Sequence, residues 1–397
     1  MLGSLSNRDF RYLQGSNLAT QLGQWVQQIG RGWLVYQLTA SPFQLGLVAF
    51  FSGFAMVVSL PFGGFLSDRF DRRRLLAISQ VLLMAIAVAM AVLLYTDTIQ
   101  LWHLYVTALL SGGVSSINNP TRQAMVHDIV GTKDLPAAVA VNSVTMNSMR
   151  VLGPSLGGVL LSSIGVGGTY MIQAVGFVAA LMATLMIRPT HQTFDNKPAS
   201  VVSSFTTGVK YARSDLTILM VLVIAFFSAM LAWPYLQLMP AYTTSRLGLG
   251  ETGYGLAMAA VGLGAVIGSF FVAASAEGRH KGIILLVSFI LTGVLQMLLG
   301  LSSIVALSVL LLLGVGTMTS VHSSLNQTVL QLNVKDEYRG RVLALFYLGF
   351  GLQPIGTLPA GTIGEHLGVH WAIFALGATM TLAGVCIALM SARVRRL

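Results

Sequence analysis

The stretch "LLAISQVLLMAIAVAMAVLL" (75–94) contains no charged residue. A helix rises 1.5 Å per residue, so a run of this length crosses the hydrocarbon core of a bilayer, which is about 30 Å thick. The rest of the chain has the same character, because 55% of its 397 residues are hydrophobic and only 9% are charged. Soluble domains carry roughly a quarter of their residues as Asp, Glu, Lys or Arg. The sequence therefore predicts a polytopic membrane protein.

Other uncharged stretches are longer than one span. Residues 151–187 and 282–334 must each hold a helical hairpin, with breaks expected at 162–168 and 300–303. These and the shorter runs predict an all-α integral membrane protein with twelve transmembrane helices. The expected helices are 13–38, 43–66, 75–95, 101–125, 136–163, 167–187, 216–239, 252–275, 282–300, 304–330, 340–364 and 369–391.

The basic residues fix the expected orientation. All but three of the 23 Lys and Arg residues fall on the side that holds the N-terminus; Arg246 lies opposite, and Arg31 and Arg150 lie within spans. Lys and Arg collect in cytoplasmic loops, so both termini are expected in the cytoplasm. The net charge of +10 is then a consequence of topology, and we expect no nucleic-acid partner.

The chain divides into two halves that resemble each other. The longest polar stretch predicts a cytoplasmic linker at 188–215, with a short amphipathic helix after Pro198, between six-helix halves at 1–187 and 216–397. "TRQAMVHDIVGTKD" (121–134) is similar to "LNQTVLQLNVKD" (325–336) after a two-residue gap. Parallel repeats of this kind place a substrate site between the halves, near the bilayer midplane.

The loop "GGFLSDRFDRRRL" (63–75) resembles the signature of the major facilitator superfamily, Gly-x-x-x-Asp-Arg-x-Gly-Arg-Arg/Lys. It departs from that pattern at Asp71, where glycine is usual. The resemblance implies the major facilitator fold, with two six-helix bundles. It also implies a latch in which Asp68 faces the start of the helix at 340–364 and Arg122, and so holds the cytoplasmic side shut. The residues assigned to this latch are Gly64, Asp68, Arg69, Arg72, Arg73, Arg122 and Arg341.

A second motif, "NSMRVLGPSLGG" (147–158), is similar to the glycine-proline motif of drug and metabolite antiporters. The resemblance implies the exporter branch that contains the enterobactin exporter and macrolide efflux proteins. Small residues let helices approach closely and proline bends them, so the motif is either a gating seam or an ordinary packing motif. The gating assignment covers Gly153, Pro154, Gly157 and Gly158. The antiporters' helix-4 arginine is missing from 104–111, which leaves the coupling ion open.

The candidate substrate site combines amides with arginines. Asn17, Gln21, Gln24, Gln28 and Arg31 fall on one face of the first helix, which either lines a cavity, as we favour, or bonds to neighbouring helices.

Arg150 lies near the midplane, and neither it nor Arg31 has an acidic partner within a span. They either attract an anionic substrate or bond to carbonyls and amides. Pro234 and Pro354 predict bent helices, and His322 either carries a proton or, as we favour, is simply hydrogen-bonded. The predicted substrate contacts are Gln24, Gln28, Arg31, Asn147, Arg150, Trp233, Gln237, Asn326 and Gln353.

These patterns predict a secondary transporter that exports small amphipathic molecules, neutral or anionic, by alternating access with proton coupling. The expected cargo is a drug or a siderophore-like metabolite. The alternatives are an importer or a lysophospholipid transporter of the same fold, and, remotely, an intramembrane enzyme or receptor. No phosphate-cradling Gly-x-x-x-x-Gly-Lys-Ser/Thr loop is present, which argues against ATP as the energy source. We expect a monomer in the bacterial cytoplasmic membrane, with no cofactor, no metal and no enzymatic activity.

Overall fold

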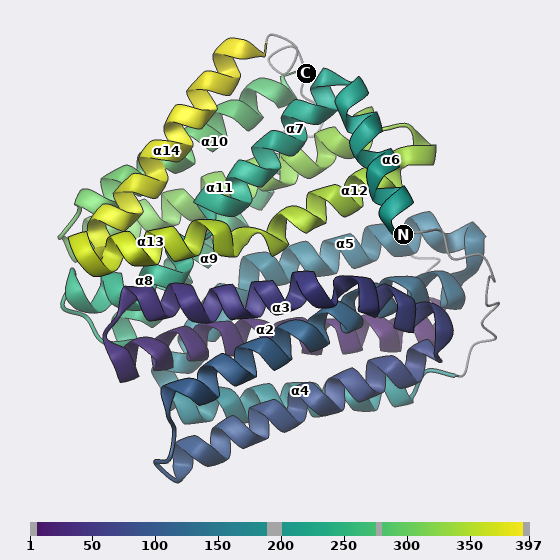
Figure 1. The fold of residues 1–397 in the computed structure, drawn as a ribbon, viewed down its shortest axis with the longest axis horizontal. Helices are drawn as coiled ribbons and strands as arrows, with labels where there is room; N and C mark the ends of the chain where they lie inside the picture. The colour runs from purple at the N-terminus through teal and green to yellow at the C-terminus, as the bar shows by residue number, and fades with distance from the viewer. Residues whose placement is uncertain (1–5, 189–200, 275–279, 392–397) are drawn as a thin grey trace. The chain divides into compact units, whose positions relative to one another are not determined.

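The computed structural model describes residues 6–188, 201–274 and 280–391. For some residues inside helices only the backbone is described, among them Gly64, Asp68, Asn147 and Arg150. Every regular element among the described residues is a helix (Figure 1). The first helices are α2 (Arg8–Thr39), α3 (Pro42–Arg69), α4 (Arg72–Tyr95) and α5 (Leu101–Leu185). The others are α6 (Val201–Ser214), α7 (Leu216–Phe227), the π-helix η1 (Ser228–Ala232), α8 (Tyr235–Ser245), α9 (Glu251–Ala274), α10 (Lys281–Leu301), α11 (Val305–Asn333), α12 (Asp336–Gly351), α13 (Gln353–Leu367) and α14 (Val369–Met390).

The long helix α5 is three helices joined by sharp breaks. Gly131 and Gly165 have φ values of 67° and 69°, in the left-handed region that glycine adopts without steric cost. They divide α5 into segments at 101–130, 132–164 and 166–185, close to the expected 101–125, 136–163 and 167–187. The break at Gly165 falls inside the expected 162–168.

Two further spans are interrupted at the expected prolines. α7, η1 and α8 follow one another from Leu216 to Ser245, with Trp233 and Pro234 at the join. α12 and α13 meet at Leu352, two residues before Pro354. Among the described residues, eight helical stretches are long and apolar enough to cross a membrane, and one of them, 137–185, contains the break at Gly165.

The described contacts divide the chain into two compact units. The first unit is Met1–Leu38 with Phe51–Lys197, and the second is Thr39–Phe50 with Pro198–Leu397. The start of α3 therefore belongs to the second unit, where Glu365 of α13 accepts hydrogen bonds from Ser41 Oγ at 2.6 Å and from the Phe43 amide at 3.3 Å. The predicted boundaries of the two halves, 187 and 216, stay predictions.

The helix expected after Pro198 is present as α6, and it packs against the second unit. Ala212 is 2% exposed, in an apolar cluster with Val342 and Phe346 of α12. The rings of Tyr211 and Tyr338 stack with 4.1 Å between centroids. Because its apolar face is covered by α7 and α12, α6 is part of that unit's core, whereas the sequence suggested a plain surface linker.

Glycines bring helices into backbone contact at matching places in the two units. In the first unit, a Cβ on Gly112 of α5 would lie 2.2 Å from the Ser52 carbonyl oxygen of α3. In the second, a Cβ on Gly316 of α11 would lie 2.1 Å from the Val261 carbonyl oxygen of α9. These distances exclude a side chain, so glycine at both places sets how closely the helices approach.

Candidate functional site

The loop between α3 and α4 is held by its own charged residues. Asp71 is the N-cap of α4, and its Oδ1 accepts the Arg74 amide hydrogen at 2.9 Å. Asp71, where glycine is usual, therefore accepts a hydrogen bond from a backbone N–H at the start of α4 that would otherwise have no partner within the helix. Arg72 Nη1 lies 2.7 Å from both carboxylate oxygens of Asp128, and Arg73 donates to the Thr184 and Leu185 carbonyls at the end of α5. The arginines of the loop thus fasten it to two places on α5.

The other residues assigned to the latch are not brought together by any described contact. Arg69 is exposed, with its guanidinium 4.6 Å from the Phe65 ring centroid. Arg341 is also exposed and lies 5.7 Å from the Tyr338 ring. For Gly64 and Asp68 only the backbone is described, so the latch itself stays a prediction.

Arg122, the remaining latch candidate, is buried inside the first unit. Its side chain is 4% exposed. It donates to the Leu13 carbonyl at 3.3 Å, to Ser16 Oγ at 3.2 Å, to Thr20 Oγ1 at 3.1 Å and to Asn118 Oδ1 at 3.4 Å. All four acceptors are neutral. Sequence reasoning placed Arg122 at a helix end, but the helix continues to 130 and α2 covers it.

More polar groups surround this arginine. Asn118 Nδ2 donates to Ser79 Oγ of α4 at 2.7 Å, and Gln80 Nε2 donates to Ser16 Oγ at 2.8 Å and to Thr184 Oγ1 at 3.0 Å. We call Ser16, Thr20, Gln80, Asn118, Arg122 and Thr184 the arginine cluster. It ties α2 and α4 to the first and last segments of α5 by hydrogen bonds that have little competition from water.

The polar face of α2 bonds to α5. Asn17 Nδ2 donates to Asn142 Oδ1 at 3.0 Å, Gln24 Nε2 to Ser115 Oγ at 3.3 Å, and Arg31 Nη1 to Ser111 Oγ at 3.4 Å.

The alternative of interhelical hydrogen bonding thus holds for three members of the face. Gln24, Gln28 and Arg31 remain only partly buried, so cavity lining stays a prediction for them.

The glycine-proline motif packs against the same helix. Gly153, Pro154, Gly157 and Gly158 are all buried in the middle segment of α5. A Cβ on Gly153 would lie 2.3 Å from the Trp25 ring, and one on Gly157 would lie 2.9 Å from Ile29 Cγ1. The motif therefore seats α2 closely against α5, and its gating role stays a prediction. Asn147 and Arg150 lie in this segment, but their side chains are outside the described residues.

Three of the four predicted contacts in the second half lie near its two helix interruptions. Trp233 and Gln237 are partly buried at the join and in α8, and Gln353 is partly buried at the start of α13. A Cβ on Gly356 would lie 1.7 Å from the Met230 carbonyl oxygen, so the backbone at the start of α13 packs directly against the backbone of η1. Breaks of this kind free backbone groups inside the membrane and are frequent at transporter sites.

His322 and Asn326 are buried in α11, on the side that faces α7. His322 is 0% exposed; its Nε2 lies 2.7 Å from Ser228 Oγ of η1, and its Nδ1 lies 3.0 Å from the Met318 carbonyl oxygen. Because a carbonyl only accepts, Nδ1 carries the proton and Nε2 accepts from Ser228. Asn326 Nδ2 donates to the Val221 carbonyl of α7 at 3.1 Å. His322 is thus hydrogen-bonded, as favoured from the sequence.

Gln173 is a candidate that the sequence analysis did not single out. It is 0% exposed in the last segment of α5, and both of its amide atoms lack a hydrogen-bond partner among the described residues. Buried amides are normally paired, so Gln173 is a candidate polar contact that sequence patterns did not indicate. The described residues contain no cluster of three His, Cys, Asp or Glu side chains that could hold a metal.

Comparison with known proteins agrees with this arrangement. The family model described as transmembrane secretion effector, of the major facilitator type, matches residues 1–396. The staphyloferrin A transporter of Staphylococcus aureus is 24% identical, with 90% of each chain covered. The enterobactin exporter EntS of Citrobacter koseri is 25% identical, covering 91% of this chain and 86% of EntS. The multidrug efflux pump Tap of Mycolicibacterium fortuitum is 23% identical, covering 96% of this chain and 95% of Tap.

A solved structure supports the fold. The inward-facing, unoccupied structure of a bacterial homologue of the human lysosomal transporter Spinster superposes with a TM-score of 0.70 at 14% identity. The match covers 98% of this chain and 97% of that chain. At 14% identity this similarity is evidence for the fold and not for the substrate.

Proposed function

Since the chain belongs to the transmembrane secretion effector family of major facilitator transporters, we propose that it exports small amphipathic molecules by alternating access, driven by the proton gradient. The family match confirms the predicted all-α membrane fold, and the relatives confirm the predicted siderophore and drug exporter branch. Likeness to siderophore and drug transporters over at least 90% of the chain is the observation that carries the proposal.

The charges inside the first unit favour neutral or anionic cargo. Arg31 and Arg122 lie within helices and bond to neutral groups. Acidic residues with described side chains, such as Asp97, Glu251 and Glu365, lie near helix ends. An anion or a polar neutral group is stabilised by a buried guanidinium, whereas a cation would be repelled by it.

The contacts proposed for this cargo are those predicted from the sequence. Gln24, Gln28 and Arg31 supply them from α2, and Asn147 and Arg150 from the middle of α5. Trp233, Gln237, Asn326 and Gln353 supply them from the second half. The protein is proposed to act as a monomer in the bacterial cytoplasmic membrane with both termini in the cytoplasm, as the distribution of Lys and Arg indicates.

Flux measurements in proteoliposomes test the proposal. We expect an imposed pH gradient to drive uptake of an anionic catecholate or of an amphipathic dye into inside-out vesicles. Arg150→Gln should abolish this flux while expression is retained, and Arg31→Gln should lower it several-fold. Arg213→Gln is the matched control, because Arg213 is exposed at the end of α6 and should be silent.

Other outcomes of this assay would favour one of the alternative functions over export. Flux only in right-side-out vesicles, towards the interior, would identify an importer. Movement of a lysophospholipid but of no catecholate or dye would identify a lipid transporter. Unchanged flux in Arg150→Gln would contradict the cargo site, and flux that ignores the pH gradient would contradict proton coupling.

The cytoplasmic latch is proposed on the loop that the arginines fasten to α5. Arg72 and Arg73 hold the loop in place, which would let Asp68 face the start of α12. We expect Asp68→Asn to slow transport while folding is largely retained. Asp97→Asn is the control, because Asp97 lies in an exposed turn with φ 53°, which asparagine tolerates. Wild-type rates in Asp68→Asn would refute the latch.

A further inference from the structure

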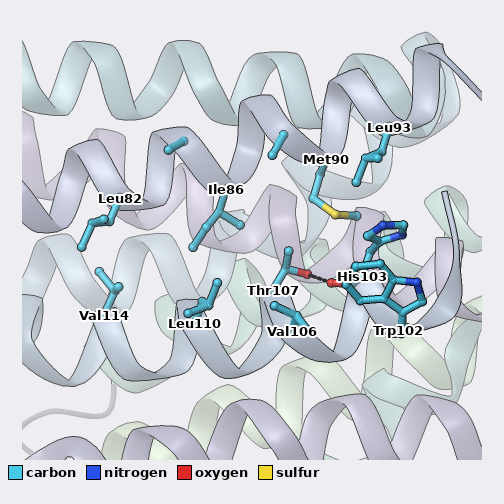
Figure 2. Close-up of a pocket in the computed structure, with 12 residues that line it drawn as sticks. Leu82, Ile86, Met90, Leu93, Trp102, His103, Val106, Thr107, Leu110 and Val114 are labelled. Atoms are coloured by element: carbon cyan, nitrogen blue, oxygen red, sulfur yellow. Dashed lines mark hydrogen bonds between the residues drawn. The ribbon is translucent and has the colours of Figure 1, made fainter. Parts of the chain in front are cut away.

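A groove runs along the outside of the first unit between α4 and the first segment of α5 (Figure 2). Its volume is about 430 Å³, and its lining is almost wholly apolar. Leu82 and Leu93 mark its two ends on α4, while the small side chains of Ala85 and Ala89 make room between them. Leu110 of α5 lines the opposite wall and is 52% exposed, so the groove opens outward.

The length of the groove matches one leaflet of a bilayer. From Leu82 to Leu93 the helix rises about 16 Å at 1.5 Å per residue. The hydrocarbon core is about 30 Å thick, so one leaflet contributes about 15 Å. The groove also ends beside the turn at 96–100, where α4 stops and α5 begins. It therefore extends from the membrane surface to about the midplane.

The surface end of the groove is polar. The rings of Trp102 and His103 lie with 3.8 Å between centroids, and Trp102 Nε1 donates to Gln100 Oε1 at 2.9 Å. His103 Nδ1 accepts the Gln100 amide hydrogen at 3.0 Å. The neutral ring therefore carries its proton on Nε2, which makes that nitrogen a donor. An interfacial tryptophan beside a hydrogen-bond donor suits the ester and phosphate oxygens of a lipid.

The residues that line the groove differ from those at the corresponding positions of the second unit. α4 and α10 align on Ser79 and Ser288, whose hydroxyls each bond to the carbonyl three residues earlier. At this alignment Ala85 corresponds to Val294, and Ala89 corresponds to Leu298.

The opposite wall also differs between the units. Where the first unit has Leu110, the repeat places Gly314 in the second, and a Cβ there would lie 3.2 Å from Leu295. The matching positions on α10 therefore carry larger side chains, and Leu295 lies close to the Gly314 position of α11.

We propose that this groove binds one acyl chain of a bilayer phospholipid, with a headgroup or ester oxygen accepting from His103 Nε2. Hydrocarbon already surrounds the helices, so the hydrophobic effect gives no preference for the groove over the bulk bilayer. Selectivity comes from close packing over the two alanines and from the polar contact at the surface end. The site is separate from the proposed cargo contacts and does not depend on the direction of transport.

Photocrosslinking tests the proposal in vesicles of phosphatidylethanolamine and phosphatidylglycerol. The probe is a trace of phosphatidylcholine with a diazirine at the end of one acyl chain, and labelled peptides are mapped by mass spectrometry. We expect the groove peptides of α4 to be labelled several-fold more than the exposed face around Ala179. Ala85→Val with Ala89→Leu, which copies the second unit, should remove the excess. Ala179→Leu is the matched control and should leave it unchanged.

A converse variant and a histidine pair sharpen the test. Val294→Ala with Leu298→Ala should create excess labelling on α10. His103→Leu should reduce phospholipid retained through detergent washing, measured by native mass spectrometry, while His103→Gln, which keeps a donor and an acceptor, should preserve it. If the variant with both Ala85→Val and Ala89→Leu folds poorly, Ala89→Leu alone is compared with Ala179→Leu.

Three results would overturn the proposal. The first is labelling of the groove no stronger than that of the Ala179 face, which would mean ordinary surrounding lipid. The second is undiminished labelling in Ala89→Leu. The third is loss of the groove label when a saturating amphipathic dye is added, which would make the groove a cargo site.

Discussion

Arg122 in the first unit and Asn326 in the second occupy the same position in the repeat that aligns 121–134 with 325–336. Both are buried, at 4% and 1% exposure, and both donate to a carbonyl on the first helix of their half. Arg122 reaches the Leu13 carbonyl at 3.3 Å, and Asn326 reaches the Val221 carbonyl at 3.1 Å. The geometry is thus repeated while the chemistry has changed from a cation to an amide.

The neighbouring positions repeat as well. One helical turn earlier lie Asn118 in the first unit and His322 in the second. In the first unit, Thr20 of α2 accepts from Arg122 at 3.1 Å; in the second, the hydroxyl of Ser228 lies 2.7 Å from His322. In the first half, a hydroxyl and a carbonyl of α2 bond to the first segment of α5. In the second half, a hydroxyl of η1 and a carbonyl of α7 bond to α11.

The difference lies in how completely the buried groups are paired. Arg122 makes four hydrogen bonds. Asn326 makes one, and its Oδ1 has no hydrogen-bond partner among the described residues. The junction of α2 and α5 should therefore resist rearrangement more than the junction of α7 and α11, which also contains the π-helix η1.

The largest expected effect comes from removing the buried cation. Arg122→Met should lower the free energy of unfolding by roughly 2 kcal/mol, since three hydrogen bonds to α2 and one within α5 are lost, at about 0.6 kcal/mol each. Asn326→Leu is the matched change in the second unit and should cost no more than about 0.6 kcal/mol, because it removes one bond and one unpaired oxygen. Unfolding in mixed micelles titrated with dodecyl sulfate measures both. Equal losses would show that the two junctions are equivalent.

Glycine contacts should instead affect the two units alike. Gly112→Ala and Gly316→Ala each place a methyl group on a neighbouring carbonyl oxygen, which should cost about 1–3 kcal/mol through forced backbone shifts. Gly15→Ala is the control, because nothing lies within 4 Å of its Cβ position, and it should be neutral or stabilise α2 by up to about 1 kcal/mol. The same micelle titration checks all three variants. A large loss for only one of Gly112 and Gly316 would break the correspondence between the units.

Helix positions were predictable because apolar runs and breakers are local signals. The spans, the α6 helix, and the interruptions near Pro234 and Pro354 follow from such signals. The burial of Arg122 does not, since it depends on α2 and α4 covering a helix face. The spacing of Asn118 and Arg122 by one turn was the available clue. Asp71 was read only as a departure from a motif, although Asp is a common N-cap and Arg74 lies three residues on.

The smallest expected effect concerns the pair of Arg72 and Asp128, which has no counterpart in the second unit. The repeat aligns Asp128 with Leu332, which is 66% exposed. The side chains of Arg72 and Asp128 are 20% and 11% exposed, so solvent screens the pair only in part. Asp128→Asn should therefore cost about 1 kcal/mol or less of unfolding free energy. Leu332→Asn is the control at the matching place and should have no effect.

A double-mutant cycle with Arg72→Met separates the ion pair from other contacts of Arg72, such as its 3.1 Å bond to the Ser67 carbonyl. A coupling of about 0.5–1 kcal/mol is expected. If the coupling is present while transport in Asp128→Asn also slows, the pair positions the loop that carries Asp68. If the coupling is present and transport is unchanged, the pair only stabilises the first unit, and the two halves differ at this end in stability alone.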